Sequence, residues 1–299
     1  MALYINHVEI EDTYAEAFKM WGARAIITAR TRKWAYEAAN RMTGFATSVI
    51  GCKCEAGIEG DVDDTLDGRP GVSVLIFTPS KDDLPKRLME RIGQTVMTCP
   101  TTACFNGLVA PDNVTIGGQL RYFGDGYQMS KLVDGRRFWR IPVMEGEFLI
   151  EDRFGMQPSV GGGNFLILGE NADVTLDAAE RAVQAMRKVR GAILPFPGGI
   201  VRSGSKTGSQ YKFLIASTND AYCPTLRGVV QTALPEGINS VLEIVIDGLD
   251  EQAVEEATRV GILAACIPGI RRITAGNYGG RLGQFKIDMH RILRQEAAA

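Results

Sequence analysis

The chain has 299 residues, 45% of them hydrophobic and 23% charged, which is the composition of an ordinary globular protein of about two domains. Its 33 Lys and Arg side chains nearly balance 35 Asp and Glu side chains, and a formal net charge of −2 argues against binding to nucleic acid. No apolar run approaches the roughly 20 residues that span a bilayer, and the acidic first residues do not resemble a signal peptide, so we expect a soluble, cytoplasmic protein that does not bind a membrane.

The first half of the chain predicts a mixture of helices and strands. A helix is expected over 31–44, and the apolar run 45–52 after it is typical of a strand. The β-branched run 71–77 predicts a strand that leads into a helix over 80–97, where Leu84, Leu88, Ile92 and Val96 recur every four positions. Further strands are expected near 118–124, 136–143 and 146–152, one after another as in a meander.

The second half repeats this order. A helix over 175–191 precedes an apolar run at 192–201, and a strand over 239–246 precedes a helix over 247–269. A shift of 168 residues (82 to 250) superimposes four pairs of identical residues at equivalent places: Asp82 and Asp250, Arg91 and Arg259, Gly93 and Gly261, Pro100 and Pro268. We therefore predict an α+β protein of two related ferredoxin-like lobes, 1–150 and 151–299, with separate and mostly antiparallel sheets.

The six cysteines do not form the dense, regular framework of a secreted protein, so we expect an intracellular protein with reduced thiols. Only His7 and His290 carry imidazole, both near the ends of the chain, and no CxxC pair occurs. We therefore predict no metal site and no Ser-His-Asp or Cys-His mechanism. The cysteines have no neighbouring base in the sequence, and we expect them to be dispensable for catalysis.

Glycines gather in four clusters, at 123–128, 160–165, 195–201 and 275–280. Such loops let the backbone approach a ligand closely, although each could equally be an ordinary turn. None of the clusters is a phosphate loop, since Ser205 stands between Gly204 and Lys206 in the nearest match to that motif.

Glu243 interrupts an apolar strand. In VLEIVI it shares a strand face with Val241 and Val245, and the repeat places Leu75 at the equivalent position of the first half. A carboxylate is costly to bury unless it is protonated or paired, so its presence in only one half indicates a functional role. The alternative is a solvent-facing glutamate on a half-exposed sheet.

Asn219, Asp220 and Tyr222 bring an amide, a carboxylate and a phenol together in one segment, 216–225. This segment could orient a polar ligand, or it could be a hydrogen-bonded Asx turn. Cys223 beside them has no basic neighbour in the sequence and is interpreted as a small core residue.

Strings spread over residues 7–289 resemble the formylmethanofuran:tetrahydromethanopterin formyltransferase family. They are HVEIEDTYAEAF, ATSVIGCKCEAGI, DGRPGV, RYFGDGYQ, PFPGGIV, ASTNDAYCPT, LPEG, EIVIDGL and TAGNYGG. The resemblance implies a homotetrameric enzyme of two α+β lobes, without a metal or a permanently bound cofactor. Its substrates would be methanofuran and tetrahydromethanopterin or a dephospho analogue, with the formyl group passing directly between them in a ternary complex.

The resemblance also carries site residues onto this chain. Glu243, in the EIVI string, corresponds to the catalytic glutamate of the family. The loop strings imply substrate-binding residues, without dividing them between the two substrates: Asp125, Tyr127, Pro197, Gly198, Gly199, Asn219, Asp220 and Tyr222. The near-neutral charge and the basic tail place the chain closer to bacterial members, which serve methylotrophic one-carbon metabolism within a formyltransferase/hydrolase complex.

The chemistry that this implies needs one group that exchanges protons between two nitrogens. A buried glutamate with a raised pKa can act as general base and then as general acid. Backbone N–H groups of a glycine loop, or the amide of Asn219, would stabilise the oxyanion. The competing hypothesis is a non-catalytic subunit that holds a ligand or serves as a scaffold, because a fold alone does not establish activity.

Overall fold

The computed structural model describes residues 2–294, so the end of the basic tail, 295–299, lies outside the described residues. The helices are α1 (Arg32–Thr43), α2 (Val49–Cys52), α3 (Asp83–Arg91), α4 (Gly117–Leu120), α5 (Ala172–Met186), α6 (Glu251–Ala265) and α7 (Met289–Arg294). The strands are β1 (Leu3–Ile5), β2 (Val8–Ile10), β3 (Tyr14–Thr28), β4 (Glu55–Val62), β5 (Gly71–Thr78), β6 (Ala103–Asn106), β7 (Asp112–Thr115), β8 (Met129–Val133), β9 (Arg136–Val143), β10 (Gly146–Glu151), β11 (Arg153–Gly169), β12 (Ala192–Ile193), β13 (Lys206–Thr207), β14 (Ala216–Ser217), β15 (Ser240–Gly248), β16 (Ile270–Thr274) and β17 (Phe285–Asp288). None of the described helices is both long and apolar enough to cross a membrane.

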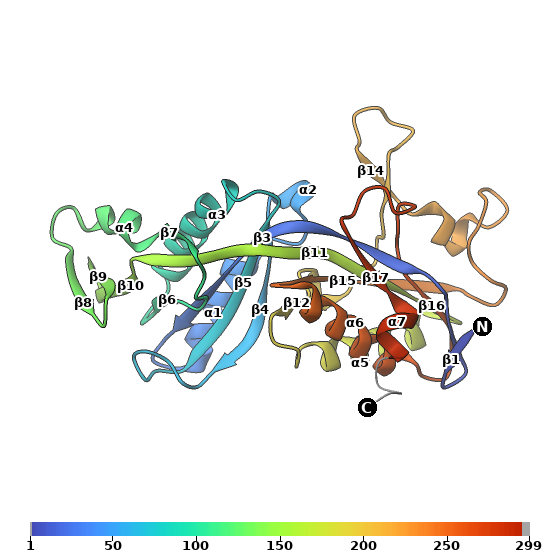
Figure 1. The fold of residues 1–299 in the computed structure, drawn as a ribbon, viewed down its shortest axis with the longest axis horizontal. Helices are drawn as coiled ribbons and strands as arrows, with labels where there is room; N and C mark the ends of the chain where they lie inside the picture. The colour runs from blue at the N-terminus through green and yellow to red at the C-terminus, as the bar shows by residue number, and fades with distance from the viewer. Residues whose placement is uncertain (1, 295–299) are drawn as a thin grey trace.

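Two long strands, β3 and β11, run side by side along the molecule and pair with each other in antiparallel register (Figure 1). The predicted α+β class is confirmed, and the strand pairs are antiparallel except for β6 with β10 and β2 with β16. The sheets are not separate as expected. Among residues 2–294, hydrogen bonds join fifteen strands into one network, because β3 and β11 are long enough to pair in both halves.

The core is divided into two main apolar clusters. One lies under α1 and α3 and the other under α5 and α6. Strand β3 contributes Ala17 to the second cluster and Ile27 to the first, while β11 contributes Phe154 to the first and Ile167 to the second. The division at residue 150 stays a prediction, since both long strands serve both clusters.

The internal repeat is visible in the strand-helix units of the two halves. Strand β5 pairs with β3 and leads into α3, and β15 pairs with β11 and leads into α6. Asp250 begins α6 by accepting a hydrogen bond from the backbone N–H of Ala253, at 2.8 Å, whereas Asp82 precedes α3 without such a bond. The predicted helices thus begin where the repeat places them.

Three of the predicted strands are wrong. Residues 45–52 end in the short helix α2, residues 118–124 form α4 and a 3₁₀ turn (Arg121–Gly124), and within 192–201 only Ala192–Ile193 is a regular strand. The reason is local: Ser48 accepts a hydrogen bond from the N–H of Ile50, and Pro197 starts a 3₁₀ turn, so turn geometry outweighs apolar character there.

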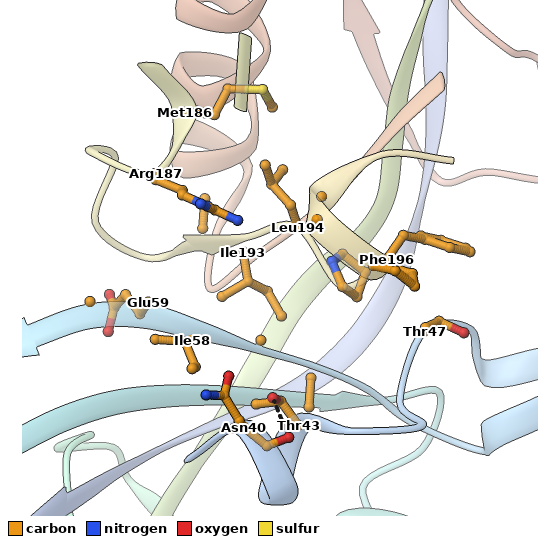
Figure 2. Close-up of a pocket in the computed structure, with 18 of the residues that line it drawn as sticks. Asn40, Thr43, Thr47, Ile58, Glu59, Met186, Arg187, Ile193, Leu194 and Phe196 are labelled. Carbon is orange, nitrogen blue, oxygen red and sulfur yellow. Dashed lines mark hydrogen bonds between the residues drawn. The ribbon is translucent and has the colours of Figure 1, made fainter. Parts of the chain in front are cut away.

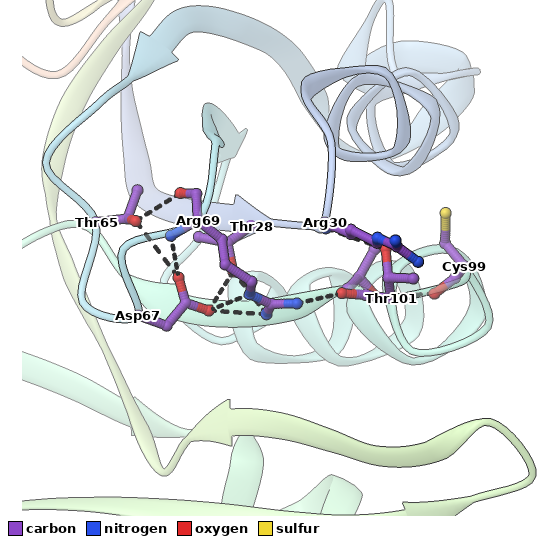
Figure 3. Close-up of polar contacts among 8 residues, drawn as sticks. Thr28, Arg30, Thr65, Asp67, Arg69, Cys99 and Thr101 are labelled. Carbon is purple, nitrogen blue, oxygen red and sulfur yellow. Dashed lines mark hydrogen bonds and ion pairs between the residues drawn. The ribbon is translucent and has the colours of Figure 1, made fainter.

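The DGRPG segment has a structural role. Asp67 accepts hydrogen bonds from Thr28, at the end of β3, and from Arg69 (Figure 3). The Arg69 guanidinium also donates to the carbonyl oxygen of Thr101, at 2.5 Å, and to the hydroxyl of Thr28. This network joins three separate stretches of the first half.

Candidate active site

Strand β15 holds Glu243 in the middle of the sheet. Its backbone pairs with Leu166 of β11 on one side, and on the other it exchanges two hydrogen bonds with Val201, at 2.7 and 3.0 Å. The carboxyl group is largely desolvated, and this burial raises its pKa from 4.5 to about 7. Glu243 is therefore neither a fully solvated surface group nor a packed core residue, and both of its protonation states are accessible near neutral pH.

Two cavities meet at Glu243. The first, which we call the Asn219 cavity, has a volume of about 820 Å³, and the second, the Tyr278 cavity, about 660 Å³. Both are lined by Val201, Ser203, Gly204 and Glu243. A group bound in either cavity can thus approach the same carboxyl group, which is the arrangement needed for transfer between two molecules.

The 216–225 segment lies on the Asn219 cavity. Asn219 and Tyr222 line it, and Gly204 packs close to Asn219, since a β-carbon on that glycine would lie 3.5 Å from the Asn219 β-carbon. The turn is closed by the backbone, because the N–H of Tyr222 donates to the Asn219 carbonyl at 3.0 Å. Asp220 is not among the lining residues. Its carboxylate instead forms an ion pair with Lys206 at 2.5 Å.

The interpretation of Cys223 as a core residue is wrong. Its side chain is partly exposed, lines the Asn219 cavity and lies 3.5 Å from the Thr218 hydroxyl. The segment is a surface turn, and its residues 218–219 and 222–225 line the cavity.

The PFPGG segment borders a third cavity, of about 640 Å³, which we call the Pro197 cavity. Pro197, Gly198 and Gly199 line it, and Ile193, Leu194 and Phe196 of the same segment lie across from α1 and β4 (Figure 2). The chain then continues to Val201 beside Glu243. Phe196 lines both the Pro197 and the Tyr278 cavities, so this segment separates them.

Asp125 and Tyr127 are not brought to Glu243. They follow α4, in the part of the molecule drawn at the left of Figure 1, away from β15. Tyr127 is 78% exposed, and neither residue lines the two cavities that meet at Glu243. Their assignment to substrate binding stays a prediction.

The Tyr278 cavity also contains residues that the sequence did not identify. Segments 48–51, 161–162 and Phe18–Met20 line it together with Tyr278. Two of the glycine clusters, 160–165 and 275–280, contribute residues to this cavity, but the sequence analysis predicted no individual site residue in either cluster. Segment 48–51 was missed because it was expected to be part of a strand.

Glu16 organises the loop that carries Tyr278. Its buried carboxylate accepts hydrogen bonds from the backbone N–H groups of Tyr278 (2.7 Å), Leu282 (3.0 Å), Gly283 (2.7 Å) and Gly280. Desolvation raises the pKa of Glu16, but these four donors more than offset it and lower the pKa to about 2. Burial, then the carboxylates of Glu243 and Glu16, raise the pKa of Tyr278, which lines the same cavity as Glu243.

Comparison with known proteins identifies the family. Residues 3–143 match the model of the formylmethanofuran-tetrahydromethanopterin formyltransferase family, and residues 146–292 match the model described as its proximal lobe. A formylmethanofuran–tetrahydromethanopterin formyltransferase of Methylococcus capsulatus is 55% identical over 97% of this chain and 100% of its own length. The chain belongs to this formyltransferase family. A component of the formyltransferase/hydrolase complex of Methylorubrum extorquens is 50% identical over 98% of both chains.

Solved structures of the family share this fold. The formyltransferase of Methanosarcina barkeri superimposes with a TM-score of 0.93 at 48% identity, over 97% of this chain and 100% of that one. A chain of the formyltransferase/hydrolase complex of Methylorubrum extorquens, solved with methylofuran, superimposes with a TM-score of 0.95 at 50% identity. The match covers 98% of this chain and 99% of that one. Within residues 2–294, no group of three or more His, Cys, Asp or Glu side chains is arranged to hold a metal ion.

The cysteines can be tested directly. Burial raises the thiol pKa of Cys54, Cys99, Cys104 and Cys266. We expect Cys223→Ser to keep the parent's transfer rate, because a hydroxyl fits the same turn and no step needs a thiolate. A bulky maleimide attached to Cys223 should inactivate the parent by filling the Asn219 cavity. After the same treatment, Cys223→Ser should be more active than the parent. A large loss of rate in Cys223→Ser itself would contradict this prediction.

Proposed function

We propose that the chain is a formyltransferase that moves a formyl group between methanofuran and a tetrahydromethanopterin in a ternary complex, with Glu243 as the general acid-base. The observation that carries the proposal is the position of one desolvated carboxyl group where two cavities meet. The names of the relatives supply the identity of the two substrates.

The reaction is an acyl transfer without oxidation or reduction. The acceptor nitrogen attacks the formyl carbon, a C–N bond forms and the carbonyl electron pair moves to oxygen. The Glu243 carboxylate takes the proton that the acceptor nitrogen must lose. It returns that proton to the donor nitrogen as the donor C–N bond breaks and the carbonyl reforms. Charge and atoms balance between the two amines, so no permanently bound cofactor is required.

The developing oxyanion needs a donor close to Glu243. Asn219 and the Gly204 backbone lie together on the Asn219 cavity, and Gly204 also borders the Tyr278 cavity. Either can supply an N–H group to an oxygen formed between the two cavities. The apolar walls around Glu243, among them Val201, Val245 and Leu242, limit the access of water, which would otherwise hydrolyse the formyl donor.

The raised pKa of Glu243 predicts a pH dependence. For transfer in the direction in which Glu243 accepts a proton first, kcat/KM should rise with pH and level off above an apparent pKa near 7. The folded-state pKa of Glu243 lies above its unfolded value, so its effect on stability has the opposite trend. The free energy of unfolding should fall as pH rises from about 4.5 to about 7. In Glu243→Gln the pH dependence of kcat/KM should disappear and the fall in stability should become smaller, as measured by initial rates and denaturation across this range.

Exchange of a labelled formyl group tests the function. The purified chain is incubated with formylated methanofuran and the pterin, and label on the pterin is followed with time. Transfer supports the proposal. Binding of both molecules without exchange would instead support the alternative, a protein that only holds ligands or serves as a scaffold.

We further propose that the active form is a homo-oligomer, and specifically the tetramer that the family resemblance implies. This oligomer can join hydrolase-complex subunits. Exposed apolar side chains on one end of the molecule support an interface there: Tyr122, Phe123, Tyr127, Met129, Leu132 and Met144. Light scattering at assay concentration should give a multiple of the chain mass of 32.5 kDa. A stable and fully active monomer would refute this.

A further inference from the structure

Two buried carboxyl groups, Glu55 and Asp247, meet beside the Tyr278 cavity. Glu55 lies on β4 and is 7% exposed, and Asp247 lies on β15 and is 0% exposed. Asp247 is four residues beyond Glu243 on the same strand face, about 13 Å along the strand at 3.3 Å per residue. Asp247 is therefore too far from Glu243 to exchange a proton with it directly, and the mechanism above leaves both groups of the pair without a role.

Each carboxyl group holds one wall of the Tyr278 cavity. Glu55 Oε1 accepts a hydrogen bond from the N–H of Val49 at 3.0 Å, in the wall segment 48–51. Asp247 Oδ1 accepts one from the N–H of Gly162 at 2.9 Å, in the wall segment 161–162. That N–H needs a partner because the register between β11 and β15 slips at this point, which leaves the bulged residues unpaired.

The second carboxyl oxygen of Asp247 is the unsatisfied atom of this pair. Within residues 2–294, no N–H or O–H group donates to Asp247 Oδ2, although this atom is buried. Its neighbour is the Glu55 carboxyl group. Two ionised carboxylates in this position would repel each other and leave a buried oxygen without a donor, whereas one proton between them supplies the missing hydrogen bond.

The titration of the two groups agrees with this geometry. Burial, and then the charge of Glu55, raise the pKa of Asp247 well above its ordinary value. Burial also raises the pKa of Glu55. A carboxyl group of the pair therefore keeps a proton at a pH where an exposed Asp or Glu has lost it.

We propose that Glu55 and Asp247 share one proton and act as positioning residues, which fix the two walls of the Tyr278 cavity against each other for the substrate that binds beside Glu243. The pair comes from β4 in the first half and β15 in the second, so it ties the halves together where the cavity lies between them. Its effect on catalysis rests on the proposed function, but the sharing of the proton does not.

A double-mutant cycle tests the shared proton. In Glu55→Gln the amide oxygen still accepts from Val49 and the amide N–H replaces the proton, and Asp247→Asn does the same from the other side. Each single variant should therefore denature close to the parent. The double variant places two NH₂ groups against each other, and its denaturation midpoint should fall by more than the sum of the single changes. A strictly additive double variant would overturn the proposal.

Steady-state kinetics tests the positioning role. Glu55→Ala releases segment 48–51, so KM for one of the two substrates should rise about tenfold or more while kcat stays within about threefold. Glu55→Gln should restore the parent's KM. A fall in kcat at unchanged KM, or a Gln variant as impaired as the Ala variant, would contradict the positioning role.

Glu151→Gln serves as a matched control. Glu151 is also a buried carboxyl group, ion-paired with Arg136 at 2.5 Å and outside the cavities that meet at Glu243. This variant should lose stability without any change in KM, which separates a general loss of stability from a loss of positioning. Failure of the proposed function would appear as no transfer by the parent protein, and the denaturation cycle would still decide the proton question.

Discussion

Glu243→Gln is expected to fold normally and to transfer the formyl group about 10²- to 10⁴-fold more slowly than the parent. This factor is the usual contribution of a positioned proton donor and acceptor. The amide preserves the size of the side chain but cannot take the proton of the attacking amine. Substrate affinity should be retained, because the walls of both cavities are unchanged. Single-turnover transfer rates, together with the binding of each substrate, measure the two effects separately.

Leu75 is the packing control for this variant, because the repeat makes it the equivalent of Glu243 in the first half of the chain. It is fully buried with Phe77 and Ile193 and lines none of the cavities that meet at Glu243. Leu75→Val should lower the free energy of unfolding by about 1 kcal/mol and leave the transfer rate unchanged. If Glu243→Gln were nearly as fast as the parent, the assignment of the proton to Glu243 would be wrong.

Glu16→Gln should destabilise the loop at 277–283 and the cavity that this loop closes. Replacing one carboxylate oxygen with NH₂ sets a donor against two backbone N–H groups, and losing two charge-assisted hydrogen bonds costs about 3 kcal/mol or more. Hydrogen exchange should become faster at Tyr278, Gly280, Leu282 and Gly283. KM for the substrate in the Tyr278 cavity should rise.

The pH dependence of the parent provides the control for Glu16. Because its folded-state pKa is lowered to about 2, its contribution to stability is complete above its unfolded pKa of about 4.5 and is lost as pH falls toward 2. Protection of the loop amides, corrected for intrinsic exchange, should therefore fall in acid in the parent and much less in Glu16→Gln. Equal acid sensitivity in the two proteins would contradict the assignment.

Several features of this protein were determined by local sequence. The strands over 71–77 and 239–246 and the helices that follow them have the periodicity of a buried face, and the structure contains them at nearly those residues. Local sequence also marked Glu243 as a candidate, since a carboxylate in an apolar row stands out against Leu75 at the equivalent place, although it left a solvent-facing glutamate as the alternative. The same local signals misled at 45–52 and 118–124, where short helices and a 3₁₀ turn form in place of the expected strands.

Tertiary structure alone decided how these residues come together. Asn219 and Tyr222 share a cavity with Glu243, whereas Asp125 and Tyr127 do not. This difference depends on which strands become neighbours, and no local pattern records it. The meeting of Glu55 and Asp247, 192 positions apart, depends on the packing of β4 from the first half near β15 from the second. Local propensity acts over a few residues, whereas the desolvation and proton sharing at this site arise from groups that only folding brings into contact.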